Sequence, residues 1–152
     1  MFQTIVWATD GSPSADRALP VVRALAGQAG SRVVVVHNIE LMVGRAGGYP
    51  VDLHEDELRA KIEGQAKELQ DSGVTTRIDV VTGGMFGPAH VIAEVAEREG
   101  ADLIVTGTRG HTPVVGLLLG SVVQRLLHIA HCPVLAVPDT RHATARTGAV
   151  SS

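Results

Sequence analysis

Glycine and serine residues in one stretch of the chain have a spacing that suits phosphate binding. The stretch reads GTRGHTPVVGLLLGSV from residue 107, with two residues between Gly107 and Gly110 and nine between Gly110 and Gly120. Glycine lets the backbone approach a ligand closely and can take positive φ. Gly120 and Ser121 begin a predicted helix, whose first N–H groups lack intrahelical partners and favour anions. With the Ser121 hydroxyl at the N-cap and the Arg109 cation, these groups can converge on a polyphosphate. Alternatively, the glycines only shape a strand-to-helix turn and Ser121 is only a cap.

Two standard phosphate-binding fingerprints are missing from the sequence. No G-x-G-x-x-G follows a predicted strand, so a dinucleotide-binding Rossmann domain is not supported. The P-loop motif requires a lysine, and Lys61 and Lys67 are the only lysines in the chain. Any phosphate cradle in the C-terminal half must therefore be built from backbone N–H groups, hydroxyls and arginine.

No set of side chains forms a recognisable metal or catalytic centre. His128, His131 and Cys132 cluster as HIAHC, but their spacing fits no standard zinc motif and the chain has no second cysteine. His37 lies within a run of valines, which favours a hydrogen-bonded core histidine over a general base. Paired carboxylates, a Ser/His/Asp set and an obvious base for activating water are all missing from the predicted loops. We therefore predict no metal site and no efficient catalysis.

The composition restricts the class of protein. A chain of 152 residues with 45% hydrophobic residues is expected to form one packed domain, and the polar stretch 139–152 is predicted to be a disordered tail. Aromatic residues make up only 3%, the net charge is −3, and no basic run occurs, so nucleic-acid binding is not expected. With one cysteine, no signal peptide and no membrane-spanning segment, the chain is predicted to be cytoplasmic.

Strands and helices alternate along the chain. Short apolar runs rich in β-branched residues predict five strands, at residues 3–8, 32–39, 75–83, 102–106 and 132–138. Periodic apolar residues between cap and proline signals predict four helices, at residues 13–30, 53–72, 88–98 and 120–130. Ser12 is the expected N-cap of the first helix, and Pro20 is expected to kink or split that helix.

Alternating strands and helices predict an α/β fold, a doubly wound parallel sheet with helices on both faces. In the order 3-2-1-4-5, the winding reverses between the first and fourth strands, and ligands bind at such a point. TDGS (residues 9–12) and GTRG (residues 107–110) follow these two strands. Asp10 can meet a ribose hydroxyl or a magnesium-bound phosphate there, or it can form a turn ahead of Gly11; its position favours the ligand.

In its motifs the sequence resembles the universal stress protein family. The glycine stretch matches the family motif G-x2-G-x9-G-[S/T] through Gly107, Gly110, Gly120 and Ser121. TDGS, GGMFGP, ADLIVTGTRG and HCPVLAVP match in the same order, so the resemblance covers residues 1–138. It implies the flavodoxin-like five-stranded sheet, and it places the chain in the branch of the family that binds ATP.

The resemblance also implies which residues surround a nucleotide. The phosphates would contact the glycine motif and the start of the following helix, at Gly107, Arg109, Gly110, Gly120, Ser121 and Val122. Adenine and ribose would lie near the ends of the first two strands, at Ala8, Thr9, Asp10 and Asn38. Thr106 and Val123 would complete the wall.

Two positions depart from the family pattern. Many relatives carry an apolar residue where this chain has Asn38, which can hydrogen-bond a base edge instead. His111 follows the second glycine and Pro113 stiffens the loop after it.

Three functions are compatible with the sequence. The first is a stress-response regulator that binds ATP, with or without Mg2+, or else AMP or cyclic AMP. The second is a slow ATPase or autokinase at the same site, an activity found in the family. The third is a binding module that acts as a homodimer without nucleotide, paired through the apolar last strand from Pro133 to Val137.

Overall fold

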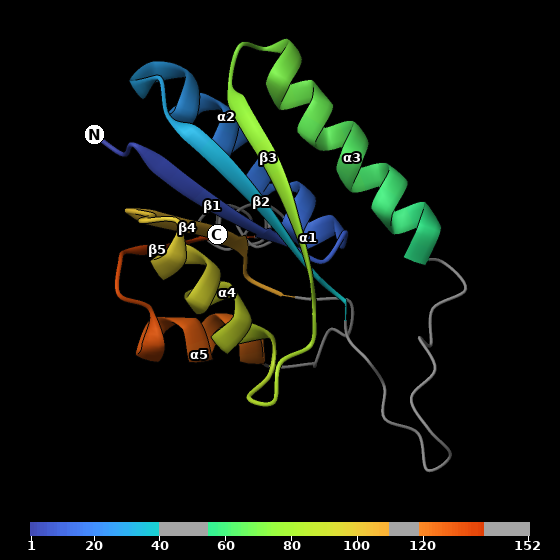
Figure 1. Cartoon of the computed structure of the whole chain (residues 1–152), viewed down its shortest axis with the longest axis vertical. Coiled ribbons are helices and arrows are strands. Elements are labelled where there is room, and N and C mark those ends of the chain that lie inside the picture. Colours follow the sequence, from blue (N-terminus) through green and yellow to red (C-terminus); the bar gives the residue numbers. More distant parts are fainter. Residues whose placement is uncertain (40–54, 110–118, 139–152) are drawn as a thin grey trace, which may run out of the picture.

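The structure is a computed structural model that describes residues 1–39, 55–109 and 119–138. The predicted tail at 139–152, together with Gly110, His111 and Pro113, lies outside the described residues. Five strands form one parallel sheet: β1 (Thr4–Thr9), β2 (Arg32–Ile39), β3 (Thr75–Thr82), β4 (Leu103–Gly107) and β5 (Val134–Val137). Their order is β3-β2-β1-β4-β5, which confirms the predicted order and α/β class (Figure 1).

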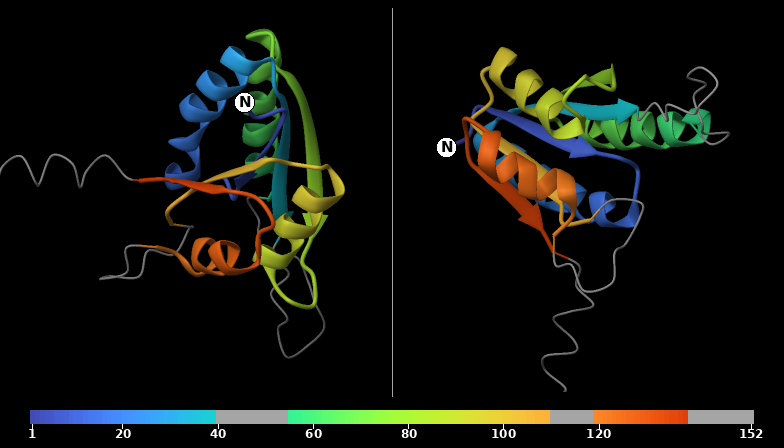
Figure 2. Two further views of the ribbon diagram at one scale, coloured as in Figure 1. Left: turned by 90° about the vertical axis from the view of Figure 1, so that its left-hand side faces the viewer. Right: turned by 90° about the horizontal axis from the view of Figure 1, so that it is seen from below.

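Helices cover both faces of the sheet. The helices are α1 (Pro13–Asp16), α2 (Ala18–Ala29), α3 (Glu55–Asp71), α4 (Pro88–Arg98) and α5 (Ser121–Ile129). The first three lie on one face, whereas α4 and α5 lie on the other (Figures 1 and 2). Successive residues of β1 and β2 point to opposite faces of the sheet and pack in two separate core clusters. One cluster contains Ile5, Trp7, Val33 and Val35, and the other contains Val6, Ala8, Val34 and Val36.

The valine run of β2 is buried because both of its faces are covered. Val33 to Val36 are at most 1% exposed, and β2 pairs with β1 on one side and β3 on the other. A strand that contacts apolar side chains on both faces needs no alternation of polar and apolar residues. The sequence bounds predicted for β2 and for α4 agree with the structure.

The first predicted helix is split into two. The split is confirmed, but it falls at Arg17, three residues before Pro20. Pro20 lies in the first turn of α2, where a backbone N–H has no intrahelical acceptor, so its missing N–H costs no hydrogen bond. Its ring would clash with the carbonyl four residues earlier if the helix continued, which places the break before Pro20. As predicted, Ser12 caps α1, because its side chain accepts a hydrogen bond from the Ala15 N–H at 3.3 Å.

Candidate functional site

The carboxyl ends of β1 and β4 lie side by side at the centre of the sheet. Trp7 of β1 is in register with Val105 of β4, so the segments after Thr9 and after Gly107 leave the same edge. Ala8, Thr9 and Thr106 are buried there, at 5%, 5% and 8% exposure. The sheet therefore brings the TDGS segment close to the start of the glycine stretch, as expected of a site at the point where the winding reverses.

The TDGS segment is a tight turn held by its own side chains. Thr9 Oγ1 accepts a hydrogen bond from the Gly11 N–H at 3.1 Å, and Asp10 Oδ1 accepts one from the Ser12 N–H at 2.9 Å. Gly11 has a φ of 76°, which an L residue rarely adopts. Asp10 therefore has the turn-forming role that was the alternative to ligand binding. It lies at the edge of the sheet where a ligand is expected.

Gly107 is required by helix packing. It is not among the glycines with positive φ in the described part of the chain, so its conformation does not require glycine. A Cβ at position 107 would lie 2.6 Å from both the backbone carbon and the carbonyl oxygen of Ser14. Gly107 thus lets α1 approach the end of β4, which fixes the spacing between the two segments of the candidate site.

The amino terminus of α5 carries no side-chain cap. Gly120 is the N-cap, with φ −70° and ψ 162°, and Ser121 is the first helical residue. The prediction that Ser121 supplies the N-cap hydroxyl is therefore wrong. The N–H groups of Ser121, Val122 and Val123 have no intrahelical acceptor, because each lies in the first turn. With hydrogen in place of a side chain at the cap, nothing from Gly120 covers these donors.

Two other backbone donors of the glycine stretch already have acceptors within the chain. The Gly120 N–H donates to the Thr108 carbonyl at 2.7 Å, and the Arg109 N–H donates to Ser14 Oγ at 3.2 Å. These bonds fold the segment after β4 back onto α1 and onto the start of α5. Among the described residues of the glycine stretch, the first turn of α5 offers backbone donors for an anion.

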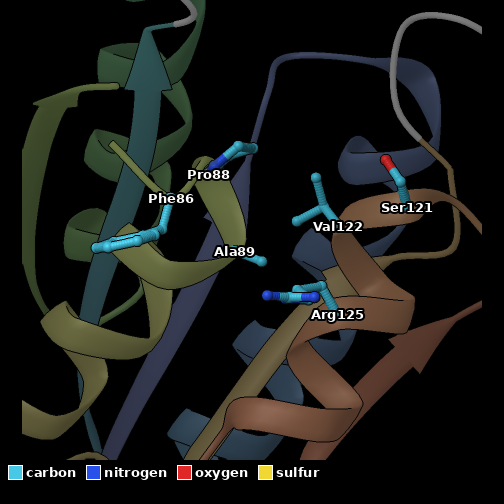
Figure 3. A pocket seen from close by; sticks show the side chains of 6 residues that line it. All are labelled: Phe86, Pro88, Ala89, Ser121, Val122 and Arg125. Carbon is cyan, nitrogen blue, oxygen red and sulfur yellow. The ribbon is translucent and has the colours of Figure 1, made fainter. Parts of the chain in front are cut away.

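A pocket opens beside the start of α5. Its volume is about 250 Å³, and it is lined by Phe86, Pro88 and Ala89 on one side and by Ser121, Val122 and Arg125 of α5 on the other (Figure 3). The Phe86 side chain is 72% exposed, and its ring centroid lies 5.4 Å from that of His90. The pocket combines an aromatic ring, an aliphatic floor, a hydroxyl and a guanidinium, which together suit a ligand with both apolar and anionic parts.

Asn38 and His37 point to opposite faces at the end of β2. His37 is buried on the α3 side, where Nδ1 lies 3.2 Å from the Thr9 carbonyl and Nε2 lies 2.9 Å from Glu55 Oε1. The expected hydrogen-bonded core histidine is thus confirmed. Asn38 alternates with it and lies on the α4 and α5 side. Its amide oxygen and nitrogen are both buried without a hydrogen-bond partner among the residues that the structure describes.

Residues 1–39, 55–109 and 119–138 contain no group of three or more His, Cys, Asp or Glu side chains that could hold a metal ion. Burial, and secondarily the nearby Asp102 carboxylate, raises the pKa of the Cys132 thiol. The thiol is consequently protonated at neutral pH, which is unfavourable for metal binding.

Comparison with known proteins places this geometry in a family. The sequence model of the universal stress protein family matches residues 1–138. A universal stress protein of Thermus aquaticus is 38% identical over 90% of this chain and 99% of its own length. One from Methanocaldococcus jannaschii is 32% identical over 90% of this chain and 95% of its own. The chain belongs to the universal stress protein family.

Solved structures of universal stress proteins share the fold. The M. jannaschii protein superimposes with a TM-score of 0.78 at 31% identity, covering 91% of this chain and 97% of its own. A universal stress protein solved in complex with cyclic AMP has a TM-score of 0.64 at 24% identity, with 90% and 96% covered. One from Archaeoglobus fulgidus in complex with dAMP has a TM-score of 0.65 at 22% identity, with 90% and 97% covered. These last two similarities support the fold alone.

Three residues of this universal stress protein site were not identified from the sequence. Ser14 packs against Gly107 and accepts a hydrogen bond from the Arg109 N–H, although both residues are far from it in the sequence. No short sequence pattern predicts these contacts. Phe86, in the segment before α4, and Arg125 of α5 line the pocket. The GGMFGP segment was a signal for Phe86, because a lone aromatic residue between glycines is exposed unless it has a partner, but only the packing of α4 against α5 brings Arg125 to it.

Proposed function

We propose that this universal stress protein binds an adenine nucleotide, ATP, across the carboxyl ends of β1 and β4. The phosphates would lie on the uncapped first turn of α5, at Gly120, Ser121, Val122 and Val123. The base and ribose would lie toward the ends of β1 and β2, near Ala8, Thr9, Asp10 and Asn38. The observation that carries the proposal is the amino terminus of α5, where N–H groups without an intrahelical acceptor follow a cap residue that has no side chain.

The donors present fit an anionic ligand. Arg109 follows β4, and Arg125 lines the pocket next to Ser121. The 2-and-9 spacing of the glycine motif supports the same site. Proteins of this fold that were solved with cyclic AMP and dAMP make an adenine nucleotide the ligand class to expect. If Mg2+ accompanies ATP, the Asp10 carboxylate could hold the ion at this edge of the sheet, and the ion would supply positive charge against the phosphates.

The role that follows from such a site is regulation by binding. A ligand that joins the TDGS turn to the start of α5 would favour one arrangement of the surrounding loops and so alter contacts with a partner. We propose a stress-response function in the cytoplasm on this basis.

The first turn of α5 can be tested with a pair of variants at Ser121. Ser121→Ala removes only the hydroxyl, whereas Ser121→Pro also removes one N–H donor. Proline fits here, because the first helical position accepts it and the ψ of 162° at Gly120 is the conformation that a following proline requires. Calorimetric titration with ATP should show a dissociation constant raised about threefold to tenfold by Ser121→Ala and more than about tenfold by Ser121→Pro.

A folded Ser121→Pro protein that binds ATP as the wild type does would contradict the proposed phosphate site. The free energy of unfolding supplies the control, and it should change by no more than about 0.5 kcal/mol in both variants.

We also propose a homodimer paired through β5, from Pro133 to Val137. β5 is an edge strand, and Leu135 leaves 37% of its surface exposed there. An unpaired apolar edge favours pairing with a second copy of the chain. We further propose that residues 1–138 constitute a single domain, consistent with the extent of the family match. In the described part of the chain, no helix is long and apolar enough to cross a membrane.

A further inference from the structure

The amide of Asn38 is a buried polar group without a partner next to the candidate site. Both Oδ1 and Nδ2 are buried, and neither makes a hydrogen bond within residues 1–39, 55–109 and 119–138. Asn38 is the only asparagine of the chain. Buried amides are nearly always hydrogen-bonded, because an unpaired one loses its interactions with water and gains none in return. This amide therefore calls for an explanation by a ligand.

The position of Asn38 directs its amide toward the candidate nucleotide site. It is the penultimate residue of β2, one strand away from β1, and Thr9 at the end of β1 is in register with His37. Asn38 shares its sheet face with Ala8 and Val36, which is the face covered by α4 and α5. That is also the face on which the start of α5 and the pocket beside it are found.

The described neighbours of Asn38 are apolar, and none of them makes a hydrogen bond with its amide. Ala8 and Val36 lie along the same face, and Val81 of β3 is its register partner. An amide in apolar surroundings at the end of a strand suits the edge of a purine, which presents hydrogen-bond donors and acceptors. The residue as a whole is only partly buried, and the χ2 torsion of asparagine is soft, so the amide can turn toward the edge of the sheet.

We propose that Asn38 is a specificity-determining residue that reads the adenine edge of the bound nucleotide. Oδ1 would accept a hydrogen bond from the 6-amino group, and Nδ2 would donate to an adjacent ring nitrogen. An amide forms this bidentate pair with adenine because its donor and acceptor match those of the base. The inference rests on the proposed nucleotide site and adds to it the group that selects the base.

The test compares ATP with purine riboside 5′-triphosphate, which carries hydrogen in place of the 6-amino group. Titration calorimetry on the full chain should show ATP binding at least about fivefold more tightly to the wild type, since one buried hydrogen bond is lost with the analogue. In Asn38→Leu, which has a similar volume and no polar atom, the two ligands should bind within about twofold of each other. Asn38→Asp keeps an acceptor for the 6-amino group and should retain the preference for ATP.

Thermal unfolding without nucleotide gives a second readout. If the amide is unpaired in the free protein, Asn38→Leu should unfold at the same temperature as the wild type or a higher one, while gaining less stabilisation from ATP. Gln28→Leu removes an exposed amide from α2 and is the matched control, with unchanged affinity for both ligands.

The outcomes separate the two proposals. Equal affinity of the wild type for ATP and the analogue, or an undiminished preference in Asn38→Leu, would overturn the role of Asn38 while leaving the nucleotide site in place. If the wild type binds neither ligand, the proposed function itself is wrong, and this inference is wrong with it.

Discussion

Glycines at the two ends of the glycine stretch have different physical roles. Gly107 has no space for a side chain, because the backbone of Ser14 lies against it. Gly120 has an ordinary extended backbone and places no side chain over the first turn of α5. A single motif thus contains one residue that sets the packing of α1 and another that exposes backbone donors, and substitutions at the two should differ in effect.

Gly107→Ala should destabilise the fold. The new Cβ would lie 2.6 Å from the Ser14 backbone, so α1 or β4 has to move. We expect a loss of about 1–3 kcal/mol in the free energy of unfolding, measured by urea denaturation. Gly27→Ala is the control, because a Cβ there meets no atom within 4 Å and a helical glycine favours replacement by alanine. Equal effects of the two substitutions would contradict the packing role of Gly107.

Glu99 links stability to pH through arginine contacts at the other end of the sheet. Its hydrogen bond with Arg77 lowers the pKa of the carboxyl; burial opposes this, and Arg32 lowers the pKa further. Because the pKa of Glu99 is lowered in the folded state, its ionised carboxylate stabilises the fold fully above the usual value of 4.5. This stabilisation is lost as the pH falls from 4.5 through the lowered pKa.

Glu99→Gln should therefore reduce the free energy of unfolding at pH 7, by up to about 1 kcal/mol because the arginines are partly solvated. The difference from the wild type should shrink as the pH falls below 4.5. Urea denaturation across this range tests the expectation, and a difference that stays constant with pH would contradict the charge-based account.

At the scale of elements, α3 holds the turn that follows β1. Lys61 Nζ donates to the Gly11 carbonyl at 2.8 Å and to Asp16 at 2.6 Å, while Gln65 donates to Asp16 at 2.9 Å. Leu58 packs so closely that a Cβ on Gly11 would lie 2.6 Å from its methyl group. The TDGS turn is thus fixed by a helix on one face of the sheet and would serve a ligand at its edge.

The two lysines of the chain form a matched pair for testing this contact. Lys61→Met should weaken the attachment of α3, lower stability by about 0.5–1 kcal/mol, and speed amide hydrogen exchange in residues 10–16. Lys67 pairs with Asp71 at the surface, where both side chains are well exposed, so Lys67→Met should change little. Faster exchange in both variants would indicate that the contact from Lys61 to Gly11 does not hold the turn.

Short sequence patterns predicted the bounds of helices and strands better than they predicted the contacts between them. The valine run predicts the bounds of β2, and the glycine before α4 and the proline that begins it predict the start of that helix. The helix breaks at Arg17 and not at Pro20, because proline is tolerated in the first turn of a helix and disrupts the turn that precedes it. The contact between Arg109 and Ser14 joins residues 95 positions apart, and it depends on how α1 packs against β4, which no local pattern contains.

For the whole molecule, the two edges of the sheet provide a test of the dimer. Leu135 on β5 and Val80 on β3 are exposed to nearly the same extent, at 37% and 38%. Leu135→Lys should convert the proposed dimer to a monomer in light scattering, because a charge on the paired edge is unfavourable. Val80→Lys, on the opposite edge, should leave the mass unchanged. A wild-type protein that is monomeric would contradict the dimer directly.

The most direct test of the central claim is to identify the ligand that the protein carries. Purified protein would be denatured, the released small molecules analysed by mass spectrometry, and the stripped and refolded chain titrated with ATP, AMP and cyclic AMP. We predict that an adenine nucleotide is released and that ATP binds the refolded protein with one site per chain. Protein that releases no nucleotide and binds none of the three would contradict the account.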